Sequence, residues 1–164
     1  LGKYSIIYRN NSPENIDKLK KFRLKCKMKR IPFFVANNID LIKALKADGL
    51  YISAYNKMII SGYIRRNLKV IGSAHNIKEI NLKKLQGCTE IILSRLFKTS
   101  YKNKKDFLGV IKFNLLSKLI NTTLTPLGGI NLKNLNKLKN LNCENVAMSS
   151  FIKEKSHQIQ CYLK

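Results

Sequence analysis

The sequence contains no apolar run long enough to cross a membrane. Its longest apolar stretches, such as "KVIGSA" and "EIILSRLF", are far shorter than the roughly 20 residues that a transmembrane helix requires. The opening "LGKYSIIYRN" lacks the charged region and the following apolar region of a signal peptide. We therefore expect no membrane span, no export signal and a cytoplasmic location. Because the chain begins with Leu1 instead of Met, we also expect a truncated N-terminus.

Cysteine is sparse and widely scattered. The sequence has no C-x-x-C pair and no histidine at ligand spacing, which excludes the common zinc motifs and a disulfide framework. We interpret the cysteines as buried or incidental thiols in a reducing compartment. They are Cys26, Cys88, Cys143 and Cys161.

Acidic residues are few, with 9 Asp and Glu against 32 Lys and Arg, and the net charge of +23 invites a nucleic-acid interpretation. The lysines, however, alternate with Leu and Ile in every helix-like segment, as on a solvated helix face. No basic block with interleaved aromatics and no recognition-helix signature is present. Lys, Asn and Ile also share AT-rich codons. We therefore attribute the charge to composition and expect no nucleic-acid partner.

The chain alternates short apolar runs with lysine-rich helical patterns. Its 164 residues, 45% of them hydrophobic, suffice for a single domain over residues 1–164 with a real core. The apolar runs are apolar at consecutive positions, which is typical of strands buried on both faces. A repeat of strand and helix predicts parallel strands with crossover helices. The seven runs are 4–9, 31–38, 49–53, 69–75, 90–97, 125–130 and 145–150.

Two architectures fit this repeat, an open doubly wound sheet and a closed (β/α)8 barrel. The open sheet usually has a glycine-rich turn after its first strand, and "YRNNSPEN" has none. A barrel holds phosphate in the loops after its last two strands, where Gly128–Gly129 and Ser149–Ser150 fall. These residues can offer N–H and hydroxyl donors to a phosphate. Alternatively, the glycines form a tight turn and the serines cap a helix.

The strand ends form an ordered series of motifs. They read "ADGLYIS", "VIGSAH", "FKTSYK", "PLGGIN" and "NVAMSS". This series resembles the thiamine-phosphate synthases and their TenI-like relatives, which carry A-D-G-V-H-L-G, G-x-S-x-H, F-P-T-x-T-K, A-I-G-G-I and G-V-A-V-V-S in the same order. The likeness runs from "IIYR" to about Ile152.

The resemblance implies a (β/α)8 barrel that joins hydroxymethylpyrimidine pyrophosphate to thiazole phosphate, forming thiamine phosphate and releasing pyrophosphate. Its implied partners are these small phosphorylated substrates, and its implied cofactor is Mg²⁺. An alternative is a non-catalytic or TenI-like barrel that binds a phosphorylated thiazole or thiamine compound. A third hypothesis, a basic nucleic-acid-associated protein, predicts lysines gathered on one face. The oligomeric state cannot be predicted from the sequence.

The resemblance also assigns roles to individual positions. Arg9, Ser73 and Lys102 match family positions that act on the departing pyrophosphate. His75 matches the family histidine, for which a structural role is an equal alternative. The positions that the resemblance gives to substrate binding are Thr99, Gly128, Gly129, Ser149 and Ser150.

Departures from the family pattern fall on its metal site and on its length. Asn37 and Asn56 stand where the family has two Mg²⁺-binding aspartates, so two formal charges are lost. The resemblance makes these asparagines the neutral ligands of a Mg²⁺ ion that arrives with the pyrophosphate, and the alternative is that surplus lysines replace the metal. Asp48 does not replace them, because it precedes its strand. Only about seven strands are visible, so we expect a barrel incomplete at its N-terminus. We expect the tail "KEKSHQIQCYLK" to be the rest of the last helix and a short end.

Overall fold

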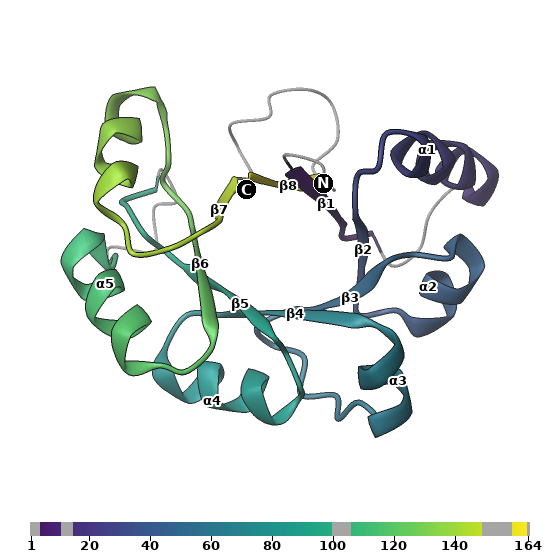
Figure 1. The fold of residues 1–164 in the computed structure, drawn as a ribbon, viewed down its shortest axis with the longest axis horizontal. Coiled ribbons are helices and arrows are strands. Elements are labelled where there is room, and N and C mark those ends of the chain that lie inside the picture. Colours follow the sequence, from purple (N-terminus) through teal and green to yellow (C-terminus); the bar gives the residue numbers. More distant parts are fainter. Residues whose placement is uncertain (1–3, 11–14, 100–105, 149–158, 164) are drawn as a thin grey trace.

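A computed structural model describes residues 4–10, 15–99, 106–148 and 159–163, and its strands form one closed barrel (Figure 1). Neighbouring strands from β1 to β7 pair in parallel, and β8 pairs antiparallel with both β7 and β1. The strands are β1 (Tyr4–Tyr8), β2 (Phe33–Ala36), β3 (Gly49–Ile52), β4 (Lys69–Ala74), β5 (Glu90–Ser94), β6 (Thr123–Leu127), β7 (Val146–Met148) and β8 (Ile159–Leu163).

The first seven strands confirm the predicted incomplete (β/α)8 barrel, but the prediction for the tail is wrong over residues 159–163. Instead of continuing a helix, these residues form β8, in which Ile159 pairs with Tyr8 and Leu163 pairs with Tyr4. Seven parallel strands alone would leave the backbone donors and acceptors of β1 and β7 unpaired at two edges. The returning C-terminal strand satisfies both edges and therefore closes the ring.

Helices lie around the outside of the strand ring (Figure 1). Four of the described helices begin at an asparagine whose side-chain oxygen accepts a backbone N–H: Asn15, Asn38, Asn76 and Asn131. Asparagine is a favoured N-cap because it satisfies a donor that the helix leaves free. The helices are α1 (Ile16–Met28), α2 (Ile39–Leu45), α3 (Gly62–Asn67), α4 (Ile77–Leu85), α5 (Gly109–Leu119) and the 3₁₀ helix η1 (Leu132–Asn140).

The strands are buried on both faces, as their consecutive apolar residues predict. Phe33 packs outward in the larger core cluster between strands and helices, while its neighbour Phe34 belongs to a separate cluster. This second cluster fills the barrel interior, where side chains of parallel strands stack in layers. Its buried members are Ile7, Phe34, Ala36, Tyr51, Ile71, Ile92 and Ala147.

Lysines on the helices that the structure describes face solvent, with one exception. On α1, they include Lys18, Lys20 and Lys25, which are all exposed, whereas Leu19 on the same helix is buried. This arrangement agrees with the interpretation of the lysines as solvated faces. Lys83 on α4 is the exception, because its side chain is completely buried.

The cysteines are free thiols where their side chains are described. Cys26 and Cys88 are buried and Cys143 is half-buried, while the side chain of Cys161 lies outside the described part. Burial raises the pKa of Cys88 to about 12, so this thiol stays protonated and unreactive at neutral pH. Over the described ranges, no helix has both the length and the apolar character needed to cross a bilayer.

Candidate active site

Three side chains from different strands meet at the carboxyl ends of β1, β3 and β4. Arg9 directly follows β1, and its guanidinium carbon lies 5.8 Å from the ring centroid of Tyr51. Tyr51, on β3, is buried in the barrel interior, and its hydroxyl forms a hydrogen bond with the side chain of Ser73 on β4. Two residues that the family resemblance assigns to pyrophosphate, Arg9 and Ser73, are therefore joined through Tyr51.

The buried phenol of Tyr51 is neutral at physiological pH. Burial raises its pKa above the ordinary value of 10.0, while the hydrogen bond from Ser73 and the positive charge of Arg9 act in the opposite direction. The group therefore serves as a hydrogen-bonding hydroxyl and not as a base. Sequence reasoning missed Tyr51, although it occupies the histidine position of A-D-G-V-H-L-G.

Asn37 and Asn56 also come together, at the carboxyl ends of β2 and β3. The Nδ2 atom of Asn56 donates to Oδ1 of Asn37 at 2.9 Å. The same Oδ1 accepts the backbone N–H of Ser53 at 3.0 Å, and Nδ2 of Asn37 donates to Ser53 Oγ at 3.1 Å. Oδ1 of Asn56 accepts the backbone N–H of Met58 at 2.7 Å. The two amides thus form a hydrogen-bonded pair.

This pair does not fit a Mg²⁺ site as it stands. Mg²⁺ is normally held through one or two carboxylates, whereas both side chains here are neutral. An amide oxygen has two lone pairs, and two N–H donors already engage those of Asn37. Among the described residues, no group of three or more His, Cys, Asp or Glu side chains could hold a metal ion.

Side chains at the C-terminal end of α4 hold the loop that carries Asn56 in place. Nζ of the buried Lys83 donates to the backbone oxygen of Asn56 at 2.8 Å and to Oε1 of Gln86 at 2.8 Å. Nε2 of Gln86 donates in turn to the backbone oxygens of Asn56 and Met58, at 3.0 and 2.8 Å. Burial lowers the pKa of Lys83, although nearby Cys88 and Glu79 oppose this effect. A buried cation therefore fixes this edge of the site.

Gly128 and Gly129 form the turn after β6, with φ angles of +102° and +70°. A Cβ at Gly129 would lie 2.4 Å from the Phe97 oxygen and 2.5 Å from the Lys98 oxygen, so only glycine fits against this backbone. The Gly129 oxygen accepts the side-chain N–H of Asn134 at 2.7 Å, at the start of η1. This geometry establishes the structural role of the turn, and the phosphate role of the glycines stays a prediction.

Two further polar groups lie near this turn, after β5. The side chain of Arg95 is next to Gly128, since its Cγ would lie 3.2 Å from a Cβ at that glycine. Its Nη2 donates to the backbone oxygen of Asp106 at 2.8 Å. Thr99, which the resemblance assigns to substrate, has a buried Oγ1 that forms no hydrogen bond within the described structure. Sequence reasoning missed Arg95, because nothing in "ILSRLF" distinguishes it from the other surplus cations.

The remaining sequence-predicted positions divide into two groups. Lys102, Ser149 and Ser150 lie outside the described residues. His75 is exposed, and its backbone and ring nitrogens bond to Glu79 Oε2 at 2.8 and 3.0 Å, which supports its structural alternative. Asp48 lies at the amino end of β3 and forms an ion pair with Arg23 at 2.9 Å, away from the candidate site.

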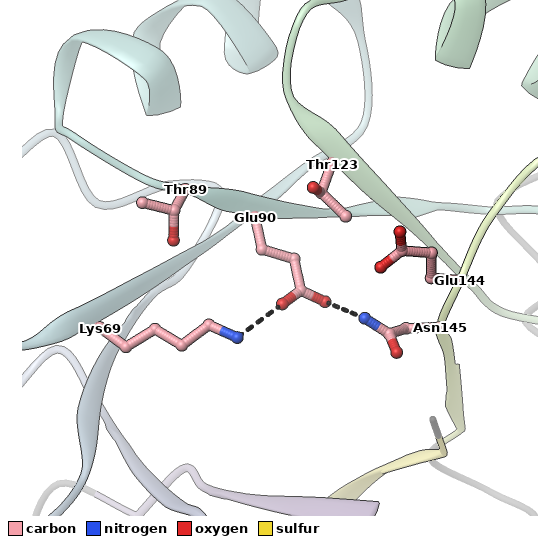
Figure 2. Close-up of a pocket in the computed structure, with 6 residues that line it drawn as sticks. All are labelled: Lys69, Thr89, Glu90, Thr123, Glu144 and Asn145. Atoms are coloured by element: carbon pink, nitrogen blue, oxygen red, sulfur yellow. Dashed lines mark hydrogen bonds and ion pairs between the residues drawn. The ribbon is translucent and has the colours of Figure 1, made fainter.

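A cavity of about 490 Å³ opens at the opposite end of the barrel (Figure 2). Its buried carboxylate, Glu90 at the start of β5, is satisfied by Lys69 at 3.2 Å, Thr125 at 2.7 Å and Asn145 at 3.3 Å. In barrels of this type, residues at the amino ends of the strands usually contribute to stability, whereas the active site lies at the carboxyl ends. We therefore place the candidate active site at the carboxyl ends and treat this polar network as structural.

The seven parallel strands, with polar side chains at their carboxyl ends, define a TIM-type barrel that β8 closes. The family model described as thiamine monophosphate synthase matches residues 2–152. The chain therefore belongs to the thiamine monophosphate synthase family.

Individual relatives agree with this assignment. The chain is similar to the thiamine-phosphate synthase of Prochlorococcus marinus subsp. pastoris, with 36% identity over 76% of this chain and 36% of that protein. A second Prochlorococcus marinus thiamine-phosphate synthase is 30% identical over 92% of this chain and 45% of its own length. The chain thus spans less than half the length of these two relatives.

A solved structure has the same fold. It is described as thiamine phosphate pyrophosphorylase from Pyrococcus furiosus, and it superposes with a TM-score of 0.62 at 18% identity. The match covers 82% of this chain and 67% of that one.

Proposed function

We propose that this barrel is a thiamine-phosphate synthase that joins hydroxymethylpyrimidine pyrophosphate to thiazole phosphate. Family membership supports this proposal. The observation that carries it in this chain is the Arg9–Tyr51–Ser73 cluster, since two pyrophosphate positions of the family pattern share one buried phenol. The substrates are small phosphorylated molecules, and the reaction belongs in the cytoplasm.

The proposed reaction breaks one bond and forms another. The C–O bond between the pyrimidinylmethyl carbon and the diphosphate breaks, and its electron pair leaves with pyrophosphate. The lone pair of the thiazole nitrogen then forms the new C–N bond, so no proton has to be removed. Catalysis consists of aligning the substrates and stabilising the charge of the leaving group. Arg9 and Lys102 would supply positive charge to pyrophosphate, and Ser73 would donate a hydrogen bond.

The other phosphate belongs at the far side of the same barrel end. We assign the thiazole phosphate to the turn of Gly128 and Gly129 together with Ser149 and Ser150. The adjacent Arg95 supports an anion at this position. The buried Oγ1 of Thr99, which has no hydrogen-bond partner among the described residues, supports a substrate contact, because a ligand can provide such a bond.

The participation of Mg²⁺ in the reaction stays a prediction. When bound to a diphosphate, the ion supplies positive charge to the leaving group. The amides of Asn37 and Asn56 already bond to one another and to the backbone. The steps assigned to this chain's own residues therefore do not depend on a protein-bound metal.

The proposed function is tested by a turnover assay with both substrates that follows thiamine phosphate. We expect product with the wild-type chain and a loss of about 100-fold in kcat for Arg9→Ala, in the range seen when one charge-stabilising donor is removed. Arg66→Ala, which removes an exposed arginine at the end of α3, is the matched control and should retain full activity. Absence of product while thiazole phosphate still binds would instead support the non-catalytic barrel.

A further inference from the structure

We propose that Asn37 and Asn56 form an anion-binding amide pair that donates hydrogen bonds directly to the diphosphate without a metal ion between them. The inference rests on the proposed function, because that function places a diphosphate at this end of the barrel. It changes the chemical role of the two positions. Acidic side chains there would bind a cation, whereas the amides present N–H groups to an anion.

The orientation of both amides is fixed by backbone donors. A backbone N–H requires an oxygen acceptor, so the N–H of Ser53 fixes the orientation of the Asn37 amide by donating to its Oδ1 at 3.0 Å. The N–H of Met58 likewise fixes the orientation of the Asn56 amide by donating to its Oδ1 at 2.7 Å. Neither amide can rotate its oxygen outward without leaving a backbone donor unpaired, which costs about 1–3 kcal/mol when the donor is buried.

Each amide retains a donor for a ligand. A side-chain amide nitrogen carries two N–H groups. Asn37 uses one for Ser53 Oγ, and Asn56 uses one for Asn37 Oδ1. Within the described residues, the second N–H of either amide has no acceptor, and both side chains are half-exposed. Two N–H groups are therefore available at the strand ends.

The surrounding charges favour an anion at this position. Asn37 follows β2, which pairs with β1, and Arg9 follows β1. Behind the pair, the buried Nζ of Lys83 lies 2.8 Å from the Asn56 backbone oxygen. Two carboxylates placed as close as these amides would repel each other and require a cation between them. Two amides attract each other through their hydrogen bond, so the pair is complete without one.

Calorimetry with inorganic pyrophosphate in EDTA tests the inference. We expect the wild-type chain to bind, and Asn56→Asp to weaken binding by about tenfold or more, since a hydrogen bond to a charged group is worth about 1.5–3 kcal/mol. Asn81→Asp adds the same charge at an exposed position on α4 and should change affinity less than twofold. Equal affinity of Asn56→Asp and wild type would overturn the inference. Circular dichroism and a second variant, Asn56→Ala, guard against misfolding.

Electron paramagnetic resonance with Mn²⁺ alone gives a second readout. We expect wild type and Asn56→Ala to leave Mn²⁺ equally free in solution. Binding of one Mn²⁺ by wild type that Asn56→Ala abolishes would show a metal site and overturn the inference. These results are independent of turnover. An inactive chain whose metal-free pyrophosphate binding depends on Asn56 would contradict the synthase function and leave the amide pair intact.

Discussion

Nζ of Lys83 lies 2.8 Å from the backbone oxygen of Asn56 and joins helix α4 to the loop that follows β3. The same ammonium bonds to Gln86, whose amide reaches two backbone oxygens of that loop. A lysine is rarely buried unless it is paired, and here the partners are neutral oxygens. Lys83 on α4 and Gln86, the residue that follows this helix, therefore hold a site loop that has no regular structure of its own.

Replacing Lys83 with Met should lower the free energy of unfolding by about 1–3 kcal/mol, because the Asn56 and Gln86 oxygens lose a donor. Lys84→Met on the exposed side of α4 should change it by less than about 0.5 kcal/mol. Urea denaturation measures both variants. A Lys83→Met protein as stable as wild type would show that the buried ammonium contributes nothing to the loop.

The pH dependence of stability should also depend on Lys83. Burial lowers its pKa in the folded chain below the ordinary 10.5, so the unfolded state binds more protons in the interval between these two pKa values. Unfolding free energy therefore rises with pH across that interval. We expect the stability of wild type relative to Lys83→Met to increase as the pH rises toward 10.5. Urea midpoints measured at several alkaline pH values check this, and a difference that stays constant would contradict it.

Gly129→Ala should destabilise the barrel more than Gly109→Ala. Both glycines have φ of +70°, but an added Cβ meets backbone oxygens only at Gly129, and nothing lies within 4 Å at Gly109. Gly109→Ala should cost about 1–2 kcal/mol from the left-handed conformation alone. Gly129→Ala adds the clash, for a total of about 3 kcal/mol or more. Thermal unfolding compares the two variants, and equal losses of stability would show that the turn after β6 accommodates the added Cβ without a further energetic cost.

Tyr51→Phe and Ser73→Ala should be coupled. Phe retains the ring beneath Arg9 and loses only the hydroxyl that bonds to Ser73. Each single change should lower stability by about 1 kcal/mol, and the double variant should lose less than the sum. A double-mutant cycle of urea denaturation measures this coupling. Strict additivity would show that the hydrogen bond contributes no stability.

The double variant Asn37→Asp and Asn56→Asp should acquire stabilisation by Mg²⁺. Two carboxylates in the geometry of this amide pair repel each other, and a divalent cation relieves the repulsion. We expect its melting temperature to rise on adding Mg²⁺, whereas that of wild type should stay constant. No response in the double variant would show that other residues complete the family's metal site.

The strand order follows from local sequence, and the closing strand does not. Consecutive apolar residues such as those of "FFVA" are sufficient to predict a strand buried on both faces. The tail is different, because β8 pairs with β1 and β7, which are distant in the sequence. The local sequence of the tail therefore does not predict this strand. The buried face of α5 does not follow from residue type either, since Leu115 and Leu119 are exposed while Phe113 is buried.

The candidate site was predictable only where a motif existed. The family series led to Arg9, Ser73 and the asparagine pair. Tyr51, Arg95 and Lys83 act through contacts between elements distant in the chain, which residue type alone does not reveal. Lys83 in particular resembles every other lysine in the sequence, and only its burial distinguishes it.

Because β8 runs against the other strands, its end at Leu163 lies beside Tyr4 and Val146. The last residues of the described chain are thus at the amino face of the barrel. A polypeptide segment or a label joined directly after Leu163 would therefore start at this amino face, away from the candidate site at the carboxyl ends of the strands.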